Sequence, residues 1–482
     1  MEDKLASPPP DITALDEDAL VHCASYLKME DITNLSLTCK RLNCISSSDS
    51  IWLRWFQEHW PLLKLPASSV KAAYIRRLTE LRKFKFCDPS TVEFQLRGRR
   101  IDHVLLDKDC IIFSQGTMIK TMKIDSLHKE VDCGHNLRGH NARITCIRLF
   151  PHNKGEDENK LCEKLMATSS ADHCIRLWSR GSSQRCFRGH SGPVLTLSDK
   201  LFGDDSVKLL ASGGEDATVR IWSLDSGRKS GQQALRATLY GHERPVKLLS
   251  IPGYKSSLLI SMSMDSKVRV WDAITSSSVR YASCVGVTTV SGAPVDMMCH
   301  DALLYVAAGT SVVAIDLKTM QKAFTSAFLQ SKICSFKMVP SKLSICTGGA
   351  DGKTLLWDVR RSQSSHKPEP VAELDGHSGP VSFLHMDRFK VITGSPEDMS
   401  IHVWDADTGQ KCNSFNCCNM EPTTRYSAIA AYGTQMVIAC HDDDRSVLHY
   451  KNFFDSVSCA RFQEDHPSKF WSCGTDADDD RE

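Results

Sequence analysis

The feature that most constrains this chain is an internal repeat. A run rich in β-branched residues and leucine ends in tryptophan five times, at Trp178, Trp222, Trp271, Trp357 and Trp404. The same step also reaches Ile124, Ile315 and Tyr450, so successive units lie 42 to 54 residues apart. A period of about 40 to 50 residues with short strands is typical of β-propeller blades. The repeat predicts an all-β propeller of eight blades, with seven as the alternative because the first and fifth units lack the tryptophan.

A polar set recurs in phase with the tryptophans. An aspartate lies six residues before each tryptophan, a serine or threonine precedes that aspartate by four or five residues, and a Gly-His pair lies upstream of four units. The four complete sets are His140, Thr168, Asp172 and Trp178; His190, Ser212, Asp216 and Trp222; His242, Ser261, Asp265 and Trp271; and His377, Thr393, Asp398 and Trp404. Histidine, hydroxyl and carboxylate together would also suit a hydrolase. A catalytic triad is needed only once, so the recurrence favours a structural role.

These recurring Gly-His, Ser/Thr, Asp and Trp-Asp elements resemble the WD40 repeat family over roughly residues 92 to 462. The resemblance implies that each polar set forms a buried hydrogen-bonded chain that locks the strands of its blade. It implies a binding platform rather than an enzyme, and the sequence contains no P-loop or dinucleotide fingerprint. Ring closure removes exposed sheet edges. We expect the closing strand at Val92 to Leu96 or near Ser456 to Phe462.

In the segment before the propeller, apolar residues recur about every 3.6 residues instead of every 2, which predicts three short helices. Their apolar faces are Leu20, Cys23, Ala24 and Leu27; Ile32, Leu35, Cys39 and Leu42; and Trp52, Trp55, Phe56 and Trp60. A further basic helix is expected from Ser68 to Phe84, as a spacer before the propeller. So small a bundle is marginal by itself.

The segment from Leu15 to Trp60 is similar to an F-box, notably at Leu15-Asp16-Glu17-Asp18-Ala19-Leu20 and Cys39-Lys40-Arg41-Leu42. Members of that family bind a Skp-type adaptor, which bridges to a cullin and a RING subunit. The resemblance implies these adaptor-binding residues: Leu15, Leu20, Leu27, Ile32, Leu35, Leu37 and Trp52. The family usually has proline after the first leucine, whereas this chain has Asp16, which can act as a helix N-cap. The alternative is a helical dimerisation cap whose apolar faces pack on each other.

The expected division of the chain is a disordered N-terminus (1–11), the F-box (12–60), a helical linker (61–90), the propeller (91–465) and an acidic disordered tail (466–482). Polar loops between strands are expected at Pro151 to Lys160, Ser226 to Gln233 and Arg361 to Pro370, because they are rich in residues that favour turns.

Composition narrows the classes of partner. The net charge is +1, from 59 basic and 58 acidic residues, which gives no overall electrostatic footprint for nucleic acid or anionic membrane. No segment reaches the roughly 18 apolar residues that span a bilayer, and the polar start lacks the apolar stretch of a secretory signal. We therefore expect a soluble protein of the cytoplasm, the nucleus or both, without a cofactor, that binds neither nucleic acid nor membrane.

The 20 cysteines are scattered through strand-like segments, where a thiol behaves as a small apolar group. Cysteines of this kind are expected to be reduced: Cys146, Cys174, Cys299, Cys334, Cys346 and Cys440. The closest sets are Cys133 with His135 and Cys417 with Cys418. Neither set has the two separated ligand pairs of a zinc site, so no metal is predicted.

Two surfaces of the propeller are candidates for partners. Basic residues occur where several units begin, at Arg100, Arg143, Arg244, Lys332 and Arg425. Guanidinium groups that converge would suit an anionic or phosphorylated substrate, whereas Glu215, Glu243 and Glu397 in equivalent loops favour an ordinary solvated surface. Separately, Trp357-Asp358-Val359-Arg360 is similar to a motif by which some propellers dock on the adaptor of a different cullin family; the alternative is that Arg360 begins a polar loop.

The resemblances together imply the substrate-recognition subunit of an SCF-type ubiquitin ligase, with the F-box on the adaptor and the propeller on the protein to be ubiquitinated. The alternative is a WD40 scaffold, or a receptor for another cullin ligase that docks through Trp357, Asp358 and Arg360.

Overall fold

The computed structural model describes residues 15–59, 69–97, 100–107, 110–124, 135–150, 165–179, 181–203, 208–224, 234–253, 255, 257–272, 284–364, 368–416, 425–442 and 445–453. Several predicted features lie outside these residues: the N-terminus (1–11), Trp60, Cys133, Cys417, Cys418, the loops at 151–160 and 226–233, the alternative closing strand at 456–462 and the tail from 466. The chain forms two compact units, residues 1–82 and residues 83–482.

The first unit is helical. It contains α1 (Glu17–Ala24), α2 (Met29–Thr38), α3 (Lys40–Ser46), α4 (Asp49–His59) and the greater part of α5 (Val70–Phe86). Leu20, Ile32, Ile45 and Trp52 are buried together in one apolar core. As the sequence predicted, Asp16 is the N-cap of α1, and its Oδ1 accepts a hydrogen bond from the N–H of Ala19 at 3.1 Å.

The predicted second helix is in fact two helices. Cys39 has an extended backbone (φ −153°, ψ 161°) between α2 and α3, and its sulfur accepts a hydrogen bond from the N–H of Leu42 at 3.5 Å. The apolar residues keep a helical spacing through this break, because Ile32 of α2 and Leu42 of α3 pack in the same core. Periodicity alone therefore could not reveal it.

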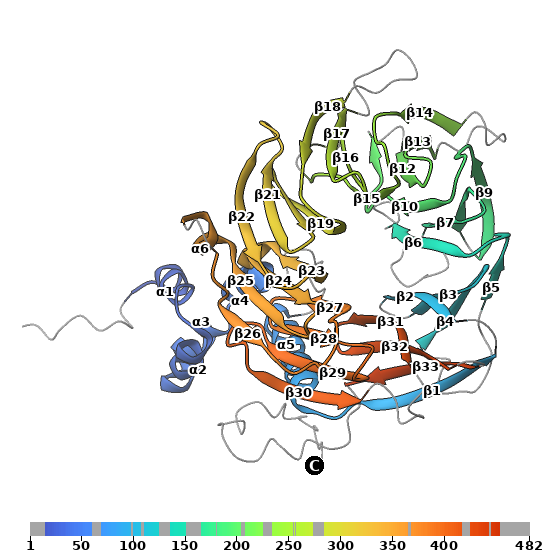
Figure 1. Ribbon diagram of the computed structural model, residues 1–482. Helices are drawn as coiled ribbons and strands as arrows, with labels where there is room; N and C mark the ends of the chain where they lie inside the picture. The colour runs from blue at the N-terminus through green and yellow to red at the C-terminus, as the bar shows by residue number, and fades with distance from the viewer. Residues whose placement is uncertain are drawn as a thin grey trace, which may run out of the picture. The chain divides into compact units, whose positions relative to one another are not determined.

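The second unit is a β-propeller of eight sheets that follow one another around a ring, as predicted (Figure 1). The first four blades, in chain order, are β2 (Ile101–Asp107), β3 (Cys110–Gln115), β4 (Met118–Lys123) and β5 (His135–Arg138); β6 (Ile144–Phe150), β7 (Leu165–Ser170), β8 (Cys174–Ser179) and β9 (Ser182–Arg188); β10 (Val194–Leu197), β12 (Lys208–Gly214), β13 (Val219–Ser223) and β14 (Leu235–Leu239), with β11 (Phe202–Gly203) paired to β12; and β15 (Val246–Ser250), β16 (Leu258–Ser263), β17 (Lys267–Asp272) and β18 (Cys284–Thr289).

Blades 5 to 8 continue the ring with the same antiparallel order. They are β19 (Pro294–His300), β20 (Leu303–Ala308), β21 (Ser311–Asp316) and β22 (Lys322–Phe328); β23 (Ile333–Val339), β24 (Ser344–Gly349), β25 (Thr354–Asp358) and β26 (Ala372–Leu374); β27 (Phe383–Met386), β28 (Lys390–Gly394), β29 (Ser400–Asp405) and β30 (Lys411–Asn416); and β31 (Arg425–Tyr432), β32 (Gln435–His441), β33 (Arg445–Asn452) and β1 (Ser90–Arg97). A short helix, α6 (Val359–Ser364), follows β25, so the first part of the loop predicted at 361–370 is helical.

Ring closure uses the first of the two predicted strands. β1 pairs antiparallel with β33 along its whole length, from Ser90 opposite Asn452 to Arg97 opposite Arg445. Val92, Phe94 and Leu96 pack against an apolar cluster that joins blade 8 to blade 1. The closing sheet is therefore made from the two ends of the propeller sequence.

Apolar clusters between neighbouring blades hold the ring together. The tryptophan of a complete set faces the preceding blade, as Trp178 does against blade 1. In two blades, the residue that spacing alone assigned to the tryptophan position is corrected by the register of the strand pairing. Tyr450 packs toward blade 1, the next blade in the ring, and Lys451, which lies over a blade 7 ring, takes the tryptophan position. In blade 1 that position is held by Met122 rather than Ile124, because Met122 lies opposite Ile111 in the ladder as Trp178 lies opposite Met166 in blade 2.

Candidate functional surfaces

The structure brings each of the four polar sets together. In blade 2, Nδ1 of His140 lies 2.9 Å from Asp172, Nε2 of His140 lies 2.9 Å from the Thr168 hydroxyl, and Nε1 of Trp178 donates to that hydroxyl at 2.8 Å. The sets that contain His190, His242 and His377 have the same three contacts at 2.7 to 3.0 Å. Each set thus links the loop before a blade to two of its strands.

The electrostatics of the sets favour a neutral histidine beside an ionised aspartate. Burial lowers the pKa of His140, and the same holds for His190 and His242. Burial alone would raise the pKa of Asp172, but hydrogen bonds from the Asn141 N–H and from His140 lower it. The four hydroxyl residues are 0% exposed. No substrate could reach those hydroxyls, so the geometry supports a structural role for the sets.

A second repeated contact was missed in the sequence. The guanidinium groups of Arg176, Arg220 and Arg269 lie against the glycines of the Gly-His pairs in blades 2, 3 and 4, where an added Cβ would come within 2.7 to 3.1 Å of them. In blade 7, His402 takes the place of the arginine and stacks on His377, with ring centroids 4.4 Å apart. The signal was present, because an arginine stands two residues before the tryptophan in three repeats.

The predicted cations lie where the innermost strands of their blades begin (Figure 1). Arg425, Arg100 and Arg143 belong to the consecutive blades 8, 1 and 2, and all three are exposed. Arg100 and Arg425 both lie near His441, whose pKa is lowered by burial and then by these two charges. Arg143 is paired with Asp102 through two hydrogen bonds of 2.9 and 3.0 Å.

The other two cations are separated from this group. Arg244 lies in blade 4 and Lys332 lies in blade 6, and both are exposed. Near Arg244, the carboxylate of Glu243 pairs with Lys267 at 2.5 Å. The structure therefore groups three of the five predicted cations on neighbouring blades and leaves the other two apart.

The Trp-Asp-x-Arg segment ends β25, the third strand of blade 6, and begins α6. Nε1 of Trp357 donates to the Thr347 hydroxyl at 2.9 Å, in a polar set without the histidine. Asp358 accepts a hydrogen bond from the N–H of Arg360 at 2.9 Å, at the start of α6. The exposed Arg360 side chain reaches the carbonyl of Lys342 at 3.5 Å.

The helical unit divides the seven predicted adaptor-binding residues into two groups. Leu20, Ile32 and Trp52 are 2 to 3% exposed and Leu35 packs against the same core. These four side chains belong to the unit's own core, because the apolar stripe of a helix packs inward, and their contact with an adaptor stays a prediction.

The other three predicted residues face solvent. Leu15, Leu27 and Leu37 are 45%, 37% and 60% exposed. Tyr26, which the sequence reasoning missed, is 67% exposed, and the Arg54 guanidinium lies 5.0 Å from the centre of its ring. These four exposed apolar side chains are candidates for contact with a partner protein.

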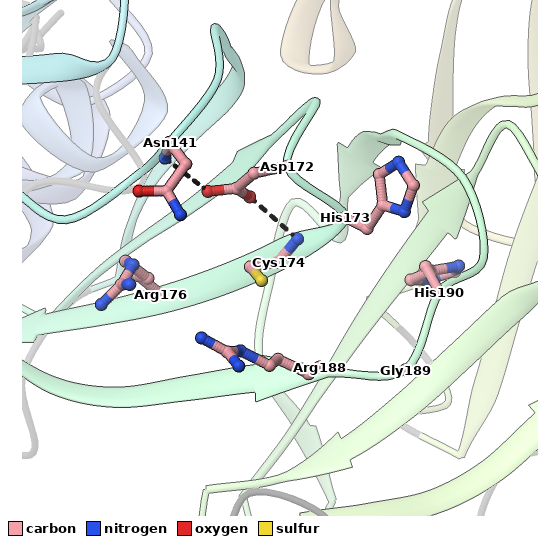
Figure 2. Close-up of a pocket in the computed structure, with 8 residues that line it drawn as sticks. All are labelled: Asn141, Asp172, His173, Cys174, Arg176, Arg188, Gly189 and His190. Carbon is pink, nitrogen blue, oxygen red and sulfur yellow. Dashed lines mark hydrogen bonds between the residues drawn. The ribbon is translucent and has the colours of Figure 1, made fainter.

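A pocket of about 310 Å³ lies on blade 2 beside the loop that leads into blade 3 (Figure 2). It is lined by Asn141, Asp172, His173, Cys174, Arg176, Arg188, Gly189 and His190. Asp172 accepts hydrogen bonds from the N–H groups of Asn141 at 2.9 Å and Cys174 at 3.0 Å.

Three further observations bear on the predicted chemistry. Within the described residues, no three His, Cys, Asp or Glu side chains are grouped so as to hold a metal ion. The helices among those residues include none that is both long and apolar enough to cross a membrane.

The six cysteines that were expected to be reduced are free thiols. Cys87 is disulfide-bonded, so the expected reduced state does not extend to it.

Family models match both units. A model described as F-box-like matches residues 17–58. A model described as WD domain, G-beta repeat matches residues 131–179, 181–223, 233–272 and 368–405. These four matches end one residue after the tryptophans of the four complete polar sets.

Curated relatives and a solved structure each match part of this chain. The ribosome biogenesis protein WDR12 homolog of Oryza sativa subsp. japonica is 25% identical over 290 residues, which are 52% of this chain and 61% of the relative. Striatin-3 of Homo sapiens is 29% identical over 166 residues, 31% of this chain and 19% of the relative. The chain thus spans less than two thirds of the length of these relatives. The crystal structure of the computationally designed Ika8 protein matches with a TM-score of 0.53 at 18% identity, over 73% of this chain and 98% of that one.

Together, the eight-bladed ring and its polar sets define a WD40-repeat propeller. With the F-box-like unit ahead of the propeller, the chain is an F-box/WD40 protein.

Proposed function

We propose that this chain is the substrate-recognition subunit of an SCF-type E3 ubiquitin ligase, acting in the cytoplasm, the nucleus or both. The observation that carries the proposal is that four apolar side chains, Leu15, Tyr26, Leu27 and Leu37, are exposed on an F-box-like unit that has its own buried core. A Skp-type adaptor would cover that surface and connect the chain to a cullin and a RING subunit. The propeller would then hold the protein to be ubiquitinated.

Co-purification of the full chain with a Skp-type adaptor tests this proposal. Leu27→Asp with Leu37→Asp should weaken adaptor binding by at least about tenfold, because central apolar contacts dominate an interface. Both side chains are exposed, so the helical core should remain intact. A matched control, Val285→Asp with Val287→Asp, changes two exposed valines of the propeller and should retain the adaptor. A wild-type chain that binds no such adaptor would sink the proposal.

For the propeller, we propose that Arg425, Arg100 and Arg143 bind an anionic segment of the substrate. Guanidinium groups pair with carboxylate or phosphate oxygens through two parallel hydrogen bonds. Proteins captured by the wild-type chain under proteasome inhibition should be lost from an Arg100→Glu, Arg425→Glu variant. They should be kept by Lys322→Glu, a charge reversal on the outermost strand of blade 5. Equal capture by all three chains would show that these arginines are ordinary solvated surface.

The second candidate is a WD40 scaffold, or a receptor for a different cullin ligase that docks through Trp357, Asp358 and Arg360. The exposed side chain of Arg360 favours it. Arg360→Ala should then remove a non-Skp adaptor from the purified complex, while the paired leucine substitutions of the helical unit leave that adaptor bound. The opposite pattern supports the first proposal.

A further inference from the structure

Blades 2 and 4 differ at a place that their polar sets have in common. In both sets, the aspartate accepts hydrogen bonds from the N–H of the residue after the histidine and from the N–H of the residue two after the aspartate itself. In blade 4 these two residues are Glu243 and Lys267, whose side chains form an ion pair at 2.5 Å. In blade 2 they are Asn141 and Cys174, which cannot form such a pair. The place where blade 4 puts its own carboxylate therefore receives none from these two positions in blade 2.

The blade 2 pocket opens at this place. Asn141 and Cys174 both line it, together with Arg176 and Arg188 (Figure 2). Arg188 lies opposite Cys174 in the ladder between β8 and β9, and Arg176 lies two residues further along β8, so the three side chains belong to one face of the sheet. Figure 2 shows Cys174 with Asp172 on one side and the two guanidinium groups on the other. One wall of the pocket thus carries two cations.

The carboxylate in the pocket does not neutralise both cations. Asp172 is already held by His140 and by two backbone N–H groups, and its side chain is only 9% exposed. Among the described residues, the Arg176 guanidinium makes one hydrogen bond, to the Ser183 hydroxyl at 3.5 Å, and its Nε is buried without a partner. Arg188 is exposed. An anion in the pocket would supply the negative charge and the acceptors that this wall lacks.

The second cation distinguishes blade 2 from two other blades with a complete polar set. At the position of Arg188, which is opposite the residue two after the set's aspartate, blade 4 has Thr289 and blade 7 has Asn416. Arg176, in contrast, has counterparts in Arg220 and Arg269 that pack on a Gly-His pair in the same way. The repeated architecture therefore accounts for Arg176 but not for Arg188.

We propose that the blade 2 pocket binds a phosphate monoester, whose phosphate group lies between Arg176 and Arg188. A guanidinium group donates two parallel hydrogen bonds to a phosphate or carboxylate. A carboxylate has two oxygens and satisfies one such group, whereas a phosphate monoester has three terminal oxygens and nearly two negative charges. The chemistry of two guanidinium groups on one wall therefore favours phosphate.

The size of the pocket sets a limit on the rest of the ligand. Its volume of about 310 Å³ is at the lower end of the range of roughly 300 to 1,000 Å³ for ligand pockets. A phosphate group with a small organic part fits such a volume. The phosphate comes either from a free metabolite or from a phosphorylated side chain of a bound protein. This site is separate from the substrate surface proposed above, which consists of Arg425, Arg100 and Arg143, and its occupation needs no adaptor.

Isothermal titration calorimetry of the full chain tests the proposal, with inorganic phosphate and glycerol 3-phosphate as probes at neutral pH and constant ionic strength. Both probes should bind the wild-type chain. Arg188→Gln should weaken their binding by at least about tenfold, because a hydrogen bond to a charged group contributes about 1.5 to 3 kcal/mol. The matched control Lys322→Gln removes an exposed cation from the outermost strand of blade 5 and should bind both probes as the wild type does.

A second variant fills the site without removing an arginine. Asn141→Glu places in blade 2 the carboxylate that Glu243 supplies in blade 4, so it should abolish binding of inorganic phosphate. Asn141 is exposed, and the thermal midpoint of this variant should stay within a few degrees of the wild type. Ser378→Glu makes the same change after the histidine of blade 7, where the residue is also exposed, and should leave phosphate binding unchanged.

A short phosphoserine peptide with blocked ends distinguishes the two sources of the phosphate group. If the peptide binds more tightly than glycerol 3-phosphate, the ligand is a phosphorylated side chain, and if it binds more weakly, the ligand is a metabolite. The proposal is overturned if phosphate gives no more heat than chloride at the same ionic strength. It is also overturned if Arg188→Gln and Asn141→Glu bind phosphate as tightly as the wild type.

Discussion

At the scale of single residues, Thr168 and Thr347 occupy the same place in two blades but differ in one hydrogen-bond partner. The hydroxyl of Thr168 contacts both His140 and Trp178. The hydroxyl of Thr347 accepts from the indole of Trp357 and donates to the carbonyl of Leu355 at 3.5 Å, and no histidine is among these partners. Both threonines are 0% exposed. The pair therefore separates the contribution of the histidine from that of the tryptophan.

Thr168→Ala should destabilise the propeller more than Thr347→Ala does. The first substitution leaves a buried indole N–H and a buried imidazole nitrogen without their partner, and the second leaves only the indole. Each buried polar atom left unpaired costs about 1 to 3 kcal/mol. Urea unfolding followed by tryptophan fluorescence measures the difference. Equal midpoints for the two variants would contradict the view that the histidine strengthens the set.

At the scale of elements, the closing strand β1 joins residues far apart in the sequence. Phe94 packs into the cluster between blades 8 and 1, whereas Gln95 points to solvent from the other face of β1. Phe94→Asp should therefore lower the free energy of unfolding by about 2 to 4 kcal/mol, because it removes apolar contacts and places a charge at a packed position. Gln95→Asp should change it by less than about 0.5 kcal/mol.

Limited proteolysis provides a second measurement of ring closure. The Phe94→Asp chain should be cut faster in blades 8 and 1 than the wild type, because a loosened β1 exposes β33. Gln95→Asp should be cut at the wild-type rate. An equal rate for both variants would mean that the ring stays closed without the Phe94 contact.

Sequence reasoning predicted the elements in which a chemical pattern repeats. It failed at positions that no repeated pattern marks. Phase and spacing were enough for eight blades and for the partners of His140 and Trp178. They could not assign Tyr450, because a shift of one residue moves a side chain to the other face of its strand. Periodicity also could not predict every exposed side chain, since Leu20 and Leu27 share one predicted helical face, yet only Leu27 faces solvent.

At the scale of the whole molecule, the polar sets make stability depend on pH. Burial lowers the pKa of His140, His190 and His242 below the ordinary value of 6.5. Burial and the Lys390 ammonium lower the pKa of His385 to about 4. Below pH 6.5 the unfolded chain therefore binds more protons than the folded chain, so acid favours unfolding.

We expect the thermal midpoint to be steady above pH 6.5 and to fall as the pH decreases from 6.5 toward 4. The lowered carboxyl pKa values of Asp172 and Asp265 act in the same direction below pH 3.8. Scanning calorimetry at constant ionic strength measures the curve. A midpoint that rises on acidification to pH 5 would contradict the buried neutral state of the histidines.

The pairing of β1 with β33 also sets an order of events during synthesis. About 355 residues separate Arg97 from Asn452, and a ribosome adds about 5 to 20 residues per second. Strand β1, with Val92, Phe94 and Leu96, is therefore synthesised roughly 20 to 70 seconds before its partner strand β33. During that time the helical unit is complete while the nascent propeller carries an unpaired apolar strand. We therefore expect chaperones to bind the incomplete propeller of this protein until its last blade is translated.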